Sequence, residues 1–322
     1  MQHVEVPSLD APRGAPLRLP GFWFPLAPTE VATPAAPVPA LVLLHGCGGP
    51  YNDARQLSLR MREYARSLNA QGVAVLVVDS LTPRGETELC TQRQGVRAVT
   101  MTQRRRDALG ALQWLAQQPG VDARRLGLLG WSNGGSTVLA ALNAHHTEVL
   151  AAPVQPSLAV AFYPGCEAEL KRGFQATAPL LMLLGAEDDW TPAAPCVALA
   201  AQATGHAVQV ESYAGAYHGF DSTAPVRLRR DVPNGVRPGQ GVHVGGQPEA
   251  RALSQQRLAA FLQERWRLPL AAGAQPGAAA SAPRPQRALM RPPPDNGTAA
   301  SPALAKPIGP PATGGGQSPQ DR

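Results

Sequence analysis

Several features that define common protein classes are missing from this sequence of 322 residues. No stretch approaches the roughly 18 consecutive apolar residues of a membrane-spanning helix, so we expect no membrane span. Aromatic residues make up only 5% of the chain, and no basic stripe with interleaved aromatics occurs, which argues against binding of nucleic acid. There is no metal-ligand spacing, no GxGxxG sequence and no Walker-type phosphate loop, so we expect no metal and no cofactor.

Cysteine is scarce as well, and the four cysteines form no CxxC pair. Cys47, Cys90, Cys166 and Cys196 are either two disulfides, which would indicate an oxidising compartment, or four small buried hydrophobic residues. The N-terminal residues lack the basic and apolar regions of a signal peptide. We therefore expect a cytoplasmic protein, with a periplasmic or secreted location as the alternative if the cysteines pair.

Composition divides the chain into three zones. Residues 1–40 are rich in proline and predict an irregular arm with one or two edge strands. Residues 41–267 alternate apolar runs with amphipathic stretches and predict the catalytic domain. Residues 268–322 consist mainly of Ala, Pro, Gly and Ser, and such a tail is predicted to be disordered because it buries too little apolar surface. The formal charge of +6 is mild, and five basic against two acidic residues place +3 of it in residues 271–322.

The middle zone has the pattern of a parallel sheet covered by helices on both faces, an α/β fold. Continuous apolar runs predict strands at Leu41–Leu44, Val73–Val78, Leu126–Leu129, Leu158–Phe162, Leu180–Leu184 and Val208–Val210. Helical spacing predicts helices at 53–70, 102–117, 133–145 and 249–266. Ligands of such sheets bind beyond the carboxyl ends of the strands.

The strongest chemical signal is Gly130-Trp131-Ser132-Asn133-Gly134-Gly135, between a predicted strand and a predicted helix. This is the context of a nucleophile elbow, in which a tight turn exposes the serine hydroxyl. His218 follows the last predicted strand and is the expected base. An acidic partner is expected in Glu187-Asp188-Asp189, and we favour Asp188 over Asp189, with Glu187 last. The order Ser, Asp, His along the chain is that of α/β-hydrolases.

Two backbone amides are expected to form an oxyanion hole. One belongs to Asn133, directly after the serine, and the other to Cys47 in the loop His45-Gly46-Cys47-Gly48-Gly49. We interpret His45 as a structural part of that loop. Arg84, after a strand end, is either a clamp for a substrate carboxylate or a solvated charge. Trp131 and Trp190 flank the expected catalytic residues and either line an acyl pocket or pack in the core.

Six motifs in order, LLHGCGG, VVDSLTPRG, VDARRLGLLGWSNGG, FYPGC, LGAEDDWTP and YHGFD, resemble the dienelactone hydrolase family of α/β-hydrolases over residues 38–266. The resemblance implies a GxxDxxxP acid motif, matched by Gly185, Asp188 and Pro192, and a base at His218. The family proper uses a cysteine nucleophile and a nearby activating glutamate, whereas this chain has Ser132 and HGCGG. It therefore resembles a serine branch of the family. Residues 227–246 have no counterpart in the compact family pattern, and relatives with such paired cysteines are often exported.

These observations predict a serine hydrolase that cleaves small or medium carboxylic esters or lactones. Two other functions are compatible with the sequence. A peptidase or acyl-peptide hydrolase would use the same triad, and a non-catalytic binding module would have the same fold.

Overall fold

The computed structural model describes residues 1–26 and 36–268. The predicted tail, apart from Leu268, lies outside the described residues. Within the described part of the chain, no helix combines the length and the apolar character needed to cross a bilayer.

A sheet of eight strands forms the centre of the fold, in the order β1-β2-β4-β3-β5-β6-β8-β10. The first two pairings, β1 with β2 and β2 with β4, are antiparallel, and all the others are parallel. The strands are β1 Gln2–Pro7, β2 Arg18–Phe24, β3 Val38–Leu44, β4 Ala74–Val78, β5 Val121–Trp131, β6 Leu158–Phe162, β8 Leu180–Gly185 and β10 Val208–Tyr213. The predicted mostly parallel sheet is therefore confirmed.

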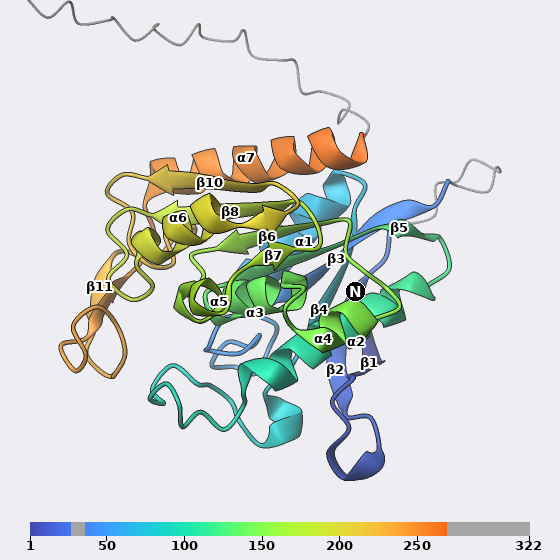
Figure 1. Ribbon diagram of the computed structural model, residues 1–322, viewed down its shortest axis with the longest axis horizontal. Helices are drawn as coiled ribbons and strands as arrows, with labels where there is room; N and C mark the ends of the chain where they lie inside the picture. The colour runs from blue at the N-terminus through green and yellow to red at the C-terminus, as the bar shows by residue number, and fades with distance from the viewer. Residues whose placement is uncertain (27–35, 269–322) are drawn as a thin grey trace, which may run out of the picture. The chain divides into compact units, whose positions relative to one another are not determined.

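Helices cover both faces of this sheet (Figure 1). They are α1 Leu59–Ala70, α2 Met101–Ala116, α3 Asn133–Leu142, α4 Thr147–Ala151, α5 Glu167–Arg172, α6 Ala193–Gln202 and α7 Pro248–Trp266, with short 3-10 helices η1 Pro12–Gly14 and η2 Thr82–Arg84. Two small sheets, β7 Gln175–Ala176 with β9 Thr204–Gly205 and β11 Arg227–Arg229 with β12 Val242–Val244, lie outside the main one.

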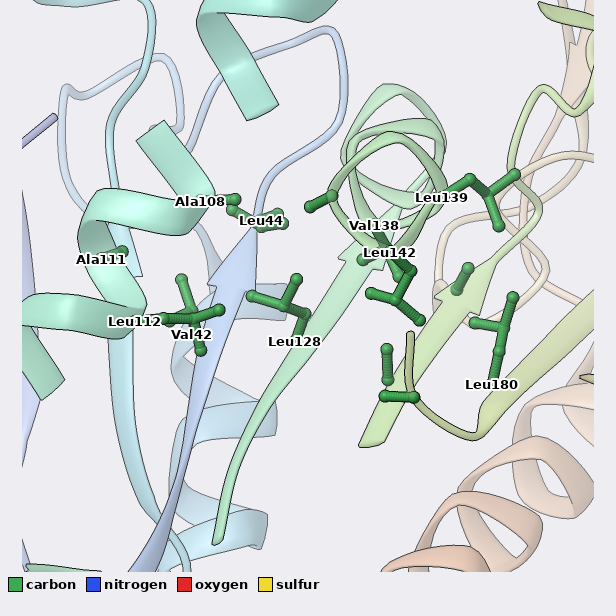
Figure 2. Packing of buried hydrophobic residues seen from close by; sticks show 14 of the residues in the cluster. Val42, Leu44, Ala108, Ala111, Leu112, Leu128, Val138, Leu139, Leu142 and Leu180 are labelled. Atoms are coloured by element: carbon green, nitrogen blue, oxygen red, sulfur yellow. The ribbon is translucent and has the colours of Figure 1, made fainter. Parts of the chain in front are cut away.

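Side chains alternate between the two faces of each central strand, so the sheet separates two apolar cores. Val42, Leu44 and Leu128 point toward α2 and α3, as Figure 2 shows. Their strand neighbours Leu41 and Leu43 pack on the opposite face with residues of α1 and α7. Burial on both faces explains why these strands consist of continuous apolar runs rather than alternating ones.

The N-terminal arm is more regular than the sequence predicted. β1 is indeed an edge strand, but β2 pairs with β1 on one side and with β4 on the other, so it is internal to the sheet. Pro20 lies within β2. The arm therefore extends the catalytic sheet, in which the parallel strands all end at one edge.

Candidate active site

The loops at the carboxyl ends of β3, β5, β8 and β10 carry the expected site residues. Ser132 stands between β5 and α3 with a φ of 54°, a left-handed conformation that is strained for a residue with a side chain. A Cβ atom at Gly130 would lie 2.2 Å from the Gly134 carbonyl oxygen, and one at Gly134 would lie 1.9 Å from the Leu44 carbonyl oxygen. Only glycine fits at these two positions, which explains the elbow motif.

Ser132, His218 and Asp188 form a continuous chain of hydrogen bonds. The Ser132 Oγ lies 2.8 Å from His218 Nε2, and His218 Nδ1 lies 2.8 Å from Asp188 Oδ2. All three side chains are buried. With its Nδ1 proton donated to the carboxylate, the imidazole presents a free lone pair on Nε2 to the serine hydroxyl.

The acid loop explains why Asp188, rather than its neighbours, faces the histidine. Asp188 Oδ1 accepts hydrogen bonds from the backbone amides of Trp190 (2.9 Å) and Thr191 (2.8 Å), which orients the carboxylate. The Thr191 hydroxyl lies 3.0 Å from Asp188 Oδ2. Asp189 turns away and contacts His243 through its Oδ2, at 2.7 Å from Nδ1. Glu187 is exposed.

Two amides are available beside the serine hydroxyl. The amide of Ser132 itself is occupied, because it donates to the Phe162 carbonyl oxygen at 2.9 Å. Among residues 1–26 and 36–268, the amides of Cys47 and Asn133 donate to no other backbone or side-chain acceptor. Both residues line the same pocket as Ser132, so this pair of amides has the placement expected of an oxyanion hole.

His45 is completely buried in the turn that leads to Cys47. Its Nε2 accepts a hydrogen bond from the Ser80 amide (3.3 Å), and its Nδ1 lies 2.7 Å from the Gly46 carbonyl oxygen. Burial, together with the positive charge of Arg104, lowers the pKa of His45 well below its usual value. A neutral ring that donates from Nδ1 and accepts at Nε2 satisfies both contacts, and His45 thereby holds the turn in shape.

The four cysteines form two disulfides, Cys47–Cys90 and Cys166–Cys196, with Cα–Cα distances of 5.0 and 5.1 Å. The first ties the turn after β3 to the loop that precedes α2. The second ties the segment after β6 to α6. Both therefore fasten loops that surround Ser132.

A pocket of about 720 Å³ opens onto Ser132 and Asn133. Its walls come from several separate segments, including residues 94–101 and the segment 233–238 between β11 and β12. Asn234 joins these two regions, since its Oδ1 accepts from the Gln94 amide and its Nδ2 donates to the Gln92 carbonyl oxygen, both at 2.9 Å. The segment 227–246, which has no counterpart in the family motifs, thus forms part of the pocket.

The three substrate-contact candidates occupy different places. Trp190 lines the pocket, and its ring lies 4.6 Å from that of His218. Trp131 does not line it, because its ring is buried and packs against Tyr64 and Phe162. Arg84 does not line it either.

Arg84 instead binds carboxylates of the protein itself. Its guanidinium donates to both Asp107 oxygens at 2.8 and 2.9 Å and to Asp10 at 2.8 Å. Of the two interpretations of Trp131, packing in the core is the one that agrees with the structure. Both interpretations of Arg84 are corrected, because its side chain is only 8% exposed and binds carboxylates of the protein itself. Sequence reasoning also missed Thr191, Asn234 and Arg104, which support the site. Of these, only Thr191 had a signal, its place in the acid motif.

A parallel sheet with helices on both faces, and an elbow serine followed along the chain by an acid and a histidine, define an α/β-hydrolase. Residues 28–265 match the model of the dienelactone hydrolase family. The chain belongs to the dienelactone hydrolase family, and it is a carboxylic ester hydrolase of that type. No curated protein matches the sequence.

Solved structures share the fold. A carboxylesterase from Lactobacillus plantarum is 16% identical with a TM-score of 0.57, over 84% of this chain and 99% of that one. A dienelactone hydrolase-like promiscuous phosphotriesterase from metagenomic libraries is 21% identical with a TM-score of 0.55, over 82% and 98%. Dipeptidyl peptidase 4 of Porphyromonas gingivalis is 17% identical with a TM-score of 0.54, over 82% of this chain but only 35% of that one. At these identities the likeness establishes the fold alone.

Proposed function

We propose that the protein is a serine hydrolase that cleaves small or medium carboxylic esters or lactones through an acyl-enzyme on Ser132. The observation that carries this proposal is the hydrogen-bond chain from Ser132 through His218 to Asp188 at the wall of the pocket. A serine hydroxyl is a weak nucleophile at neutral pH unless a base takes its proton, and the 2.8 Å contact with His218 Nε2 provides that base.

In the first half of the reaction, Ser132 Oγ attacks the acyl carbon while its proton passes to His218 Nε2. The carbonyl oxygen becomes an oxyanion that accepts hydrogen bonds from the Cys47 and Asn133 amides. Collapse of this intermediate breaks the bond to the alcohol oxygen, which takes the proton from His218. Asp188 stabilises the imidazolium that exists between these steps.

In the second half, His218 takes a proton from water as the water oxygen attacks the acyl carbon of the acyl-enzyme, and the new oxyanion accepts hydrogen bonds from the same two amides. Ser132 Oγ leaves with the proton, and the carboxylic acid is released. Each oxyanion donor contributes a factor of about 10²–10³ in rate, and acid–base catalysis contributes about 10²–10⁴. A lactone gives the same steps, with the alcohol remaining attached to the acid.

Part of the pocket wall is apolar. Val236 lines the pocket and has an exposed fraction of 56%. An apolar side chain left in water at such a place offers a surface for an acyl or alcohol chain. The disulfides Cys47–Cys90 and Cys166–Cys196 further support an oxidising compartment, periplasmic or extracellular, over the cytoplasm.

The test is hydrolysis of p-nitrophenyl acetate by the wild-type protein and by Ser132→Ala. Ser136→Ala is the matched control, because Ser136 is another serine that lines the pocket. Circular dichroism establishes that each variant folds. We expect Ser132→Ala to lose at least about 10³-fold in kcat and Ser136→Ala to retain most of it. A folded Ser132→Ala variant with wild-type turnover would remove Ser132 from the mechanism, and faster cleavage of matched anilides than of esters would indicate a peptidase.

A further inference from the structure

Arg104, on the first turn of α2, is a buried cation that does not itself line the pocket but contacts Asn133, which does. Its exposed fraction is only 1%. Nη1 donates to the Asn133 side-chain oxygen at 2.6 Å, and Nη2 donates to the His45 carbonyl oxygen at 2.8 Å. One guanidinium therefore bridges the elbow after β5 and the turn after β3.

These two acceptors belong to the two segments that supply the free amides. Asn133 carries one of the amides on its own backbone. His45 lies two residues before Cys47, which carries the other. The distance between the two amides, and their relative orientation, depend on how these separate segments are held together. The rigid planar fork of an arginine is suited to fixing two acceptors at once.

Arg104 has no carboxylate partner within the described chain. The nearby carboxylates are engaged elsewhere, because Asp107 binds Arg84 and Asp79 accepts the Leu81 and Thr82 amides. Burial lowers the pKa of Arg104 to about 10, and the cations Arg84 and Arg97 act in the same direction, whereas the carboxylates of Asp107 and Asp79 partly offset this effect. The guanidinium remains charged at neutral pH, although burying a charge that has no carboxylate in ion-pair contact is costly.

Natural proteins keep such energetically unfavourable groups mainly at functional sites. An oxyanion is absent in the resting protein and forms only during the reaction, and it would add to the attraction that Asp107 and Asp79 already exert on Arg104. Two other buried arginines, Arg84 and Arg105, differ from Arg104 because each has a carboxylate within ion-pair distance.

We propose that Arg104 is a positioning residue that couples the two halves of the oxyanion hole, by holding Asn133 through its side chain and Cys47 through the His45 carbonyl. This inference rests on the proposed function, because it assigns a role in stabilising the acyl transition state. Acylation and deacylation each form an oxyanion that accepts hydrogen bonds from the same two amides, so the loss of this coupling lowers kcat whichever half is slower. Binding of the uncharged ester does not use the oxyanion contacts fully, so KM changes little.

The experiment compares four proteins on p-nitrophenyl acetate: wild type, Arg104→Met, Asn133→Ala and the double variant. Asn133→Ala keeps the backbone amide and removes only the acceptor of Arg104. Arg105→Met is the matched control, since Arg105 is the next residue on α2, is also largely buried and pairs with Glu148 away from the pocket. The rate at which a fluorophosphonate labels Ser132 is measured in parallel.

We expect Arg104→Met to lower kcat by about 10- to 100-fold, less than the removal of a complete oxyanion donor, with KM within about twofold of wild type. Asn133→Ala should show a smaller loss in kcat, and the double variant should lose less than the product of the two single losses because the same contact is removed twice. Labelling should slow in parallel, while Arg105→Met should retain kcat.

Wild-type kcat in folded Asn133→Ala, and in Arg104→Met where it folds, would overturn the coupling role. So would a loss confined to KM, or one that Arg105→Met reproduces. These outcomes differ from failure of the proposed function itself, in which the wild-type protein would neither hydrolyse the ester nor be labelled, and the inference would fall with it.

Discussion

Replacing Arg84 with methionine separates a structural role of this arginine from the substrate-binding role that its sequence position indicates. The side chain of Asp107 is 0% exposed and that of Arg84 is 8% exposed. Arg84 contacts both oxygens of Asp107 and also Asp10. Removing one partner of a buried ion pair costs about 3–5 kcal/mol, because the remaining charge stays buried without compensation.

The expected loss lies in the lower part of that range, since both carboxylates keep another partner. Asp107 still accepts the Ser8 hydroxyl at 2.5 Å, and Asp10 still lies 3.5 Å from Arg106. A loss of 3 kcal/mol corresponds to a decrease of roughly 6–12 °C in Tm for a domain of this size. Arg84 joins Asp107 of α2 to Asp10 in the segment after β1. Its loss should therefore weaken the packing of the N-terminal edge of the sheet.

The assay combines urea unfolding with kinetics. Arg84→Met should unfold at lower urea, while its KM for p-nitrophenyl acetate and for an ester that carries a free carboxylate should both stay near wild type. The double variant Arg84→Met/Asp107→Asn should recover part of the stability, because it removes the uncompensated charge. If Arg84→Met keeps wild-type stability and selectively raises KM for the anionic ester, the structural argument is refuted.

Three further perturbations test the supports of the site. The pKa of His45 is lowered in the fold, so below pH 6.5 the unfolded chain takes up a proton that the folded chain does not. In urea unfolding below pH 6.5, the free energy of unfolding of the wild type should therefore fall by up to about 1.4 kcal/mol more per pH unit than that of His45→Gln. Equal slopes for the two proteins would contradict this. The Cys47–Cys90 disulfide joins residues 43 apart in the sequence. Replacing both cysteines with alanine should lower the free energy of unfolding by about 2–4 kcal/mol and should also lower kcat. An unchanged kcat would show that the turn after β3 keeps its conformation without the disulfide. Asn234→Ala removes both hydrogen bonds between two segments that line the pocket, each of which contributes about 0.5–1.5 kcal/mol. KM for long-chain p-nitrophenyl esters should therefore change severalfold, whereas KM for the acetate should not. Equal changes in KM for both esters would show that Asn234 does not influence acyl selection.

The buried strands were predictable because strands that are buried on both faces consist of continuous apolar runs. β6 has the predicted bounds, Leu158–Phe162, and β8 differs from its prediction by one residue, Gly185. Three of the four predicted helix starts lie within one residue of those of α2, α3 and α7, and the fourth was wrong. The spacing predicted a helix from residue 53, but residues 53–58 form turns and α1 begins at Leu59. The short elements α5 and β11 have too few residues to show a period at all.

The candidate site divides in the same way. The elbow, the acid motif and the histidine are local patterns, and the three side chains that they indicated lie in hydrogen-bond contact. The contacts that hold these patterns together are long-range. Arg84 meets Asp10 and Asp107, which are 74 and 23 residues away, and Asn234 meets Gln94 across 140 residues. A local motif contains no information about such partners.

The run Arg104-Arg105-Arg106 shows why charge alone is a poor guide to function. Successive residues of an α-helix point about 100° apart, so three adjacent arginines must face three directions. Arg105 and Arg106 reach Glu148 on α4, whereas Arg104 faces the elbow and meets only neutral oxygens. In the sequence the three are equivalent. In the fold, two of them have a carboxylate in ion-pair contact, whereas the third bonds to neutral oxygens of the elbow and of the turn after β3.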